Sequence, residues 1–133
     1  MISAIVVEDS DIVRALWRKM AAKIAGLSLT GEFSRASTAI AAIRRAPPDV
    51  VLLDIHLSEG NGMEVLRVVA AEYPMTKVIV VSNCADAIHR RHYTAAGVYA
   101  FYDKSHELAA MRCTLEHLGL GLDRQQACRD EFV

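Results

Sequence analysis

Apolar residues fall in short unbroken runs, which are separated by longer segments with helical spacing. Five runs are expected to form strands: residues 4–7, 27–33, 50–53, 77–81 and 98–102. Most of them are continuous and rich in β-branched side chains, which is typical of strands buried on both faces of a parallel sheet. The run at 50–53, Val-Val-Leu-Leu, leads directly into Asp54, so a stretch suited to the interior ends on a carboxylate.

The segments between the runs predict five helices, over about 11–25, 35–46, 62–72, 85–96 and 106–118. The first carries apolar residues four positions apart: Ile12, Leu16, Met20 and Ile24. Ser34 and Ser105 are expected to cap the second and the fifth helix. Glycine or proline follows four of the helices: Gly26, Pro47, Pro74 and Gly97.

Strand and helix therefore alternate five times along the chain. This order predicts an α/β fold, a five-stranded parallel sheet that is doubly wound, with helices on both faces through right-handed crossovers. We expect one domain over residues 1–120. Residues 121–133 are mixed in composition and have no clear period, so we interpret them as a C-terminal tail or the start of a linker.

Composition narrows the class of protein further. The 133 residues are 53 % hydrophobic and 23 % charged, as in soluble globular domains, and the net charge of -1 gives no electrostatic reason to bind nucleic acid or an anionic membrane. No apolar run approaches the ~20 residues of a membrane span, and the N-terminus lacks the features of a signal peptide. Three cysteines without a CxxC pair indicate a reduced, cytoplasmic setting.

Polar side chains follow four of the predicted strands at their carboxyl ends. They are Glu8, Asp9, Asp54, Ser82, Asp103 and Lys104. Ligands of open parallel sheets bind outside the carboxyl ends of the strands, so we expect these side chains to gather at one edge. Any one of them alone would be explained as a helix cap or a solvated loop residue. Their joint placement is the main functional signal in the sequence.

Three carboxylates at one edge repel one another by about 4 kcal/mol per pair, at ~4 Å and an effective dielectric of ~20, unless a proton or a cation offsets the charge. Hard oxygen ligands that are open to water favour Mg2+. A lysine and a hydroxyl beside such an ion suit a phosphoryl group, and a carboxylate can itself be the nucleophile that becomes an aspartyl phosphate. The pattern therefore predicts phosphoryl chemistry at Asp54.

Four stretches of the chain resemble the receiver domain of bacterial two-component response regulators, over about residues 2–118. "VVEDSD" resembles the family's first strand and acidic pair, and "VVLLDIHLSEGNGMEVL" its phosphoacceptor strand and the loop that follows. "VIVVSN" is similar to the switch-hydroxyl motif, and "AAGVYAFYDKS" to the last strand with its lysine. The stretches agree with the family in order and in spacing. The resemblance implies a flavodoxin-like fold.

The resemblance also implies roles for the matching residues. A histidine kinase or phosphotransfer protein would pass a phosphoryl group to Asp54, which Lys104 and Ser82 would contact, and Ser82 and Phe101 would act as the switch pair. The implied Mg2+ ligands are Asp9, Asp54, the main-chain carbonyl of His56 and, through water, Glu8. The chain would then catalyse nothing beyond its own phosphorylation and dephosphorylation.

The same family suggests the partners. Phosphorylation would change partner or dimer contacts, with a homodimer through the face formed by the fourth helix, fifth strand and fifth helix. We expect no contact of this domain with nucleic acid or membrane. The 133 residues leave no room for a DNA-binding output domain, so the chain either stands alone or is an excised part of a longer regulator.

Three positions depart from the family pattern. Ser58 stands where the family usually has a proline four residues after the acceptor, which predicts a more mobile loop. Ser105 replaces the proline that often follows the lysine, and we expect a trans peptide there because a cis bond without proline costs ~3–4 kcal/mol. Asn83 replaces the small residue common after the switch hydroxyl.

Two other functions fit part of this pattern. Asp9 and Asp11 form a D-x-D motif that resembles the haloacid-dehalogenase phosphatases, with Asp9 as nucleophile, but that mechanism leaves Asp54 without a role. A receiver-like interaction module that is never phosphorylated stays open because of Ser58 and Ser105.

His89 and His92 lie three positions apart with Cys84 just before them, a partial set of zinc ligands. No fourth ligand is suitably spaced, so we interpret these histidines as a solvated helix face.

Overall fold

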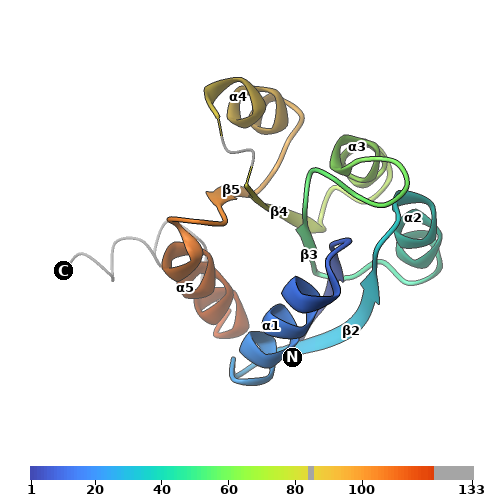
Figure 1. The fold of residues 1–133 in the computed structure, drawn as a ribbon. Helices are drawn as coiled ribbons and strands as arrows, with labels where there is room; N and C mark the ends of the chain where they lie inside the picture. Colours follow the sequence, from blue (N-terminus) through green and yellow to red (C-terminus); the bar gives the residue numbers. More distant parts are fainter. Residues whose placement is uncertain (84–85, 122–133) are drawn as a thin grey trace.

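The computed structural model describes residues 1–83 and 86–121. Five strands alternate with five helices (Figure 1): β1 (Ile2–Val7), α1 (Asp11–Ala22), β2 (Leu27–Phe33), α2 (Ala36–Arg45), β3 (Val50–Leu53), α3 (Gly62–Glu72), β4 (Lys77–Ser82), α4 (Ala87–Ala95), β5 (Ala100–Asp103) and α5 (Leu108–Gly119). All neighbouring strands pair in parallel, in the order β2-β1-β3-β4-β5. The predicted doubly wound parallel sheet is confirmed.

The helices cover the two faces of the sheet unequally. α1 and α5 lie on one face and α2, α3 and α4 on the other (Figure 1). Successive strand residues point to opposite faces, so Leu52 packs toward α1 and α5 while Val51 and Leu53 pack toward α2 and α3. Both faces of β3 are fully buried, which explains its unbroken apolar run.

The first helix turns a different face to the core than its four-residue repeat suggested. Trp17 and Ala21 are buried, whereas Ile12 is 76 % and Leu16 is 59 % exposed. Consecutive helical residues differ by about 100°, so the contact of Trp17 with the sheet turns Leu16 away from it. Two apolar side chains therefore remain on the surface of α1.

Both predicted serine caps are wrong. Arg35 precedes α2 and Glu107 precedes α5, and neither donates or accepts a side-chain capping bond. The carbonyl of Ser34 accepts hydrogen bonds from Ser58, and the N–H of Ser105 donates to Asp103 Oδ1 at 2.8 Å. The Asp103 side chain thus folds the segment after β5 into a turn, which delays the start of α5.

The ends of the other elements are close to those predicted. β1 begins at Ile2 rather than at residue 4, β4 includes Ser82, and β5 begins at Ala100 rather than at residue 98. The proposed tail at 121–133 lies outside the described residues apart from Gly121. No helix in the described part of the chain has the length and apolar character needed to cross a bilayer.

Candidate functional site

The two central strands bring the acidic residues together. β1 pairs with β2 on one side and with β3 on the other, so the chain reverses its winding direction at β1 and leaves a crevice at the carboxyl ends of β1 and β3. Val7 and Leu53 are register partners, and each is followed by carboxylates. The Asp54 N–H donates to Val7 O at 2.9 Å, which fixes the backbone of Asp54 beside Glu8.

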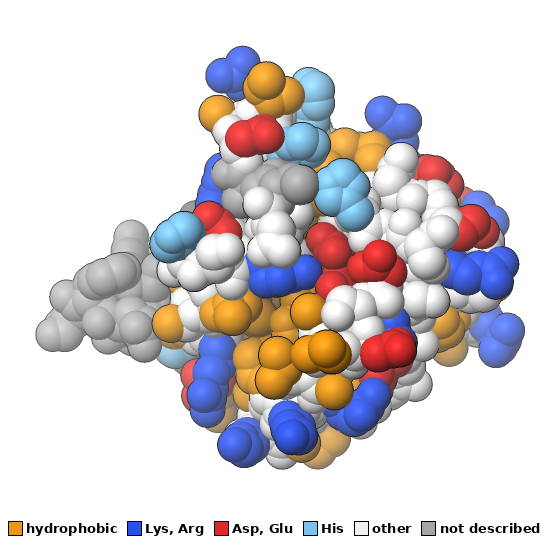
Figure 2. Space-filling model, viewed as in Figure 1, with side chains coloured by type: hydrophobic (Ala, Val, Ile, Leu, Met, Phe, Trp, Pro, Cys, Tyr) orange, Lys and Arg blue, Asp and Glu red, His pale blue; other side chains and the backbone are white. Residues whose placement is uncertain are grey.

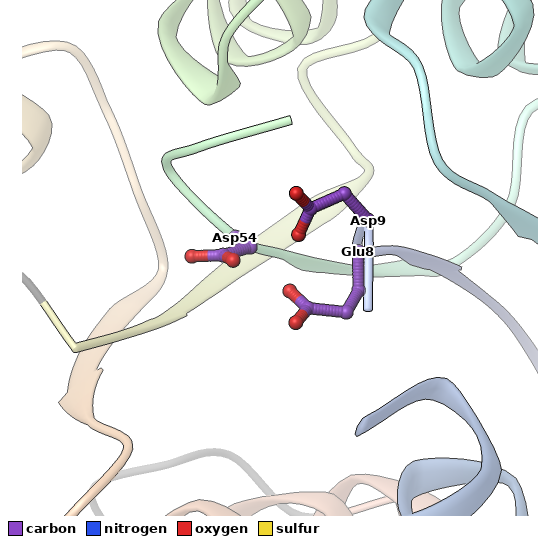
Figure 3. A group of neighbouring side chains, drawn as sticks. All are labelled: Glu8, Asp9 and Asp54. Atoms are coloured by element: carbon purple, nitrogen blue, oxygen red, sulfur yellow. The ribbon is translucent and has the colours of Figure 1, made fainter. Parts of the chain in front are cut away.

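Glu8, Asp9 and Asp54 form one carboxylate cluster (Figure 3). Each residue offers a carboxylate oxygen, and these oxygens lie within 4.8 Å of one another. Glu8 is 1 % exposed and Asp54 is 7 % exposed, while Asp9 lies open to solvent. Glu8 Oε2 is buried and receives no hydrogen bond from any described residue. The cluster is therefore mostly buried, rich in negative charge and incompletely paired.

Lys104 supplies the positive charge of the site. Its Nζ lies 3.2 Å from Glu8 Oε1 and 3.5 Å from Asp54 Oδ2, and its side chain is 13 % exposed. The Lys104 N–H donates to Ser82 O at 3.0 Å, which continues the pairing of β4 with β5 beyond Asp103. One ammonium thus faces carboxylates from both β1 and β3.

The single ammonium does not balance the cluster. Burial, with a smaller contribution from Asp54, raises the pKa of Glu8 to about 8, and Lys104 opposes this only in part. Glu8 therefore holds a proton at neutral pH in the ion-free protein. A divalent cation would replace that proton, and the donor set of hard oxygens with one unpaired buried oxygen fits Mg2+.

Asp54 is held by its own loop. Its Oδ1 accepts from the Ile55 N–H at 2.7 Å, which leaves Oδ2 on the side of Lys104. Gly62 begins α3 so close to this loop that an added Cβ would lie 2.6 Å from Asp54 O. Only glycine allows the start of α3 to approach the aspartate in this way.

The loop after Asp54 is better anchored than the absence of proline suggested. The Ser58 N–H and hydroxyl both donate to Ser34 O, at 3.1 and 2.8 Å, and a proline could not make the first of these bonds. The Glu59 carboxylate accepts a hydrogen bond from the Ser37 hydroxyl at 2.5 Å, which ties the loop to the first turn of α2. These bonds argue against the predicted extra mobility.

The remaining predicted residues have definite places. Ser82 is fully buried at the end of β4, and His56 lies exposed in the loop after β3. Phe101, on β5, is buried beneath α4, where the Tyr93 ring lies 5.9 Å and the Arg90 guanidinium 5.1 Å from its ring centroid. Figure 2 shows histidine side chains gathered beside the acidic patch on this face.

Two further expectations concern bonds and metals. No cis peptide is present among the described residues, so the Lys104–Ser105 bond is trans as predicted.

His89 Nδ1 contacts both Asp86 carboxylate oxygens, at 3.0 and 2.9 Å. Within the described residues, the acidic trio is the one group of three or more side chains arranged for a metal ion, and Cys84 lies outside them.

The family model for the response regulator receiver domain matches residues 4–116. The chain belongs to the response regulator receiver family. Response regulator GacA of Pseudomonas syringae pv. syringae (strain B728a) is 32 % identical over 111 residues, which cover 84 % of this chain and 52 % of GacA. The chain thus spans about half the length of this curated relative. The family assignment favours the receiver over the haloacid-dehalogenase-like alternative.

Solved receiver structures share this fold. The response regulator domain of Thermotoga maritima CheB has a TM-score of 0.73 at 25 % identity, over 80 % of each chain. A LuxR-family two-component response regulator from Aurantimonas sp. SI85-9A1 has a TM-score of 0.82 at 19 % identity, over 100 % of this chain and 99 % of that one. The second likeness concerns the fold alone.

Several contacts around this receiver site were not predicted from the sequence. Trp17 lies against Lys104, Arg14 donates to the carbonyl of Glu8 at 2.6 Å, and Arg90 pairs with Glu107 across α4 and the start of α5. Arg14, Trp17 and Arg90 lie within helices, away from the strand ends and the motifs. Their partners are distant in sequence or come from other elements, so no local pattern indicated them.

Proposed function

We propose that Asp54 accepts a phosphoryl group from a phosphorylated histidine of a kinase or phosphotransfer protein, in a Mg2+-dependent reaction. The observation that carries this proposal is the mostly buried cluster of Glu8, Asp9 and Asp54, with Lys104 between the carboxyl groups of Glu8 and Asp54. An ion pair that only stabilises the fold would need a single carboxylate opposite Lys104. Three carboxylates at the rim of the sheet suit a divalent ion and a phosphoryl group.

The ion would be held by Asp9 and Asp54, by the main-chain carbonyl of His56 and, through water, by Glu8. The unpaired Glu8 Oε2 and the all-oxygen donor set support this choice of metal. When bound, Mg2+ supplies positive charge that offsets the phosphoryl oxygens. The chain itself orients the nucleophile, because the Ile55 N–H holds Asp54 Oδ1 and leaves Oδ2 facing Lys104.

In the transfer step, an Asp54 carboxylate oxygen forms a bond to phosphorus while the donor's P–N bond breaks. The electron pair of that bond stays on the imidazole nitrogen, which takes a proton from solvent. Lys104 pairs with a phosphoryl oxygen and the Ser82 hydroxyl donates to another. No separate substrate is turned over, so the domain acts as a signalling module rather than as an enzyme.

Two surfaces fit this role. Hydrophobic side chains are exposed over α1, beside the acidic patch (Figure 2). The exposed large hydrophobic residues of α1 are Ile12 and Leu16. This surface suits docking of the phosphodonor protein, since it adjoins the acceptor. The output would pass through Ser82 and Phe101 to the α4–β5–α5 face, which forms partner or homodimer contacts. We place the protein in the cytoplasm and expect no nucleic acid or membrane contact by this domain.

Intact mass spectrometry after incubation with acetyl phosphate tests the proposal. Wild type is expected to gain one phosphoryl group with Mg2+ and none with EDTA, and Asp54→Asn is expected to gain none. Glu116→Gln, at an exposed position on α5, serves as a matched control that keeps the gain. Phosphorylation of Asp54→Asn would overturn the proposal in favour of a phosphatase with Asp9 as nucleophile. An unmodified wild type would support a module that is never phosphorylated.

A further inference from the structure

Lys104 has a third contact that the phosphoryl chemistry does not require. Its Nζ lies 5.5 Å from the centroid of the Trp17 ring on α1. Trp17 is 4 % exposed and is the one tryptophan of the chain. The ammonium therefore lies among two carboxyl groups, which directly follow β1 and β3, and the aromatic face of a residue of α1.

An indole face attracts a cation through its quadrupole, and tryptophan does so best among the aromatic side chains. The attraction is stronger where water is largely excluded, and the Lys104 side chain is only 13 % exposed. A lysine is a point charge on a flexible four-carbon stem, so two carboxylates alone leave many orientations open to it. The Trp17 ring occupies the space on the side of α1, so it excludes the orientations in which the Lys104 side chain turns toward that helix.

The other cations of α1 do not compete for this place. Arg14 pairs with Asp11 and donates to the carbonyl of Glu8, and Arg18 makes two bonds to Glu32 across α1 and β2. Lys19 is exposed, as is Lys23 directly after the helix. Lys104 is thus the cation that the described structure brings to the indole.

We propose that Trp17 is a positioning residue for Lys104. Its ring holds the ammonium against Glu8 and Asp54, so that Lys104 is already placed to pair with the phosphoryl oxygen that arrives on Asp54. The kinetic part of this inference rests on the function proposed above. The contact itself does not, because it exists in the unphosphorylated protein.

Fluorescence tests the contact directly, since the emission of this protein's single tryptophan reports on the surroundings of Trp17. In EDTA, Lys104→Met is expected to change the intensity or the wavelength of the emission. Lys19→Met, which removes an exposed lysine from the same helix, is the matched control and is expected to leave the emission unchanged. Identical spectra for wild type and Lys104→Met would overturn the proposal, whatever happens at Asp54.

Kinetics then separate positioning from packing, since Trp17 also belongs to the core. Trp17→Phe keeps an aromatic face, whereas Trp17→Leu fills space without one. With acetyl phosphate and Mg2+, Trp17→Leu is expected to phosphorylate about threefold to tenfold more slowly than wild type, as the size of the interaction suggests. Trp17→Phe should recover most of the rate, and the Mg2+ affinity of both variants should stay within about twofold of wild type.

A double-mutant cycle completes the test. In a Lys104→Met background, Trp17→Leu is expected to cause no further slowing, because the group that it positions is gone. Equal slowing by Trp17→Leu in both backgrounds, or equal rates for the Phe and Leu variants, would show a purely structural role. If wild type accepts no phosphoryl group at all, the proposed function fails while the fluorescence result still decides the contact.

Discussion

Replacing Glu8 by Gln is expected to stabilise the Mg2+-free protein, and to do so increasingly as the pH rises. Glu8 is 1 % exposed, and burial together with Asp54 raises its pKa from 4.5 to about 8. A glutamine fills nearly the same space as Glu8 but carries no charge. The ion-free site of the variant therefore holds no buried carboxylate at this position.

The magnitude follows from proton linkage. Between pH 4.5 and 8 the unfolded chain releases the Glu8 proton while the folded protein keeps it, so the free energy of unfolding falls as the pH rises through this window. Each pKa unit corresponds to about 1.4 kcal/mol, so the difference between the pKa of Glu8 in the unfolded and folded protein corresponds to about 5 kcal/mol of unfolding free energy. About 3 kcal/mol of this is lost by pH 7. The contribution of Glu8 to stability is therefore fully present below pH 4.5, and its loss levels off above pH 8.

Urea denaturation in EDTA at pH 5, 7 and 9 measures the effect as the difference between Glu8→Gln and wild type, which cancels the titration of other groups. The difference should grow with pH in favour of the variant, whereas Glu116→Gln, an exposed change, should track wild type throughout. Added Mg2+ should stabilise wild type more than Glu8→Gln, because the ion and the Glu8 carboxylate offset each other's charge and glutamine has no charge to offset. A difference that does not change with pH would refute the electrostatic account of the site.

The remaining predictions concern the two sides of the acceptor. Gly62→Ala places a Cβ 2.6 Å from Asp54 O and should cost about 1–3 kcal/mol of unfolding free energy by urea denaturation, with slower phosphorylation by acetyl phosphate. Glu107→Gln removes the ion pair with Arg90, whose guanidinium covers the Phe101 ring and donates to the Phe101 carbonyl at 3.0 Å. Amide hydrogen exchange in α4 should speed up in this variant, while the free energy of unfolding changes by less than about 1 kcal/mol because the pair is partly exposed. Unchanged protection of α4 would mean that Arg90 needs no partner to cover Phe101.

The sheet and the acidic cluster were predictable because both follow from strand residues and their immediate successors. A short, β-branched run such as 50–53 is typical of an inner strand, and in a parallel sheet the residue after it lies at the same edge as Glu8 and Lys104. Periodicity and order along the chain are enough for that inference.

The caps and the supporting contacts were not predictable because distant residues decide them. Glu59, from the loop after β3, accepts the bonds at the start of α2 that Ser34 was expected to accept. Trp17 and Lys104 are far apart in sequence and meet only once α1 has packed on the sheet. Local preference ranks the candidates for a cap, but packing of another element can satisfy the same N–H groups first.

Lys104 connects the proposed phosphorylation site of this receiver domain to α4 through short covalent and hydrogen-bonded links. Its side chain lies on the acceptor carboxylate, and its neighbour Asp103 donates its N–H to Glu107 Oε1 at 2.9 Å. Glu107 holds Arg90 of α4, which covers Phe101. A displacement of Lys104 toward a phosphoryl group on Asp54 would pull on the segment after β5 and thus on the pair that holds α4. The segment between Asp103 and Glu107 therefore connects the acceptor to α4 through contacts that the structure shows.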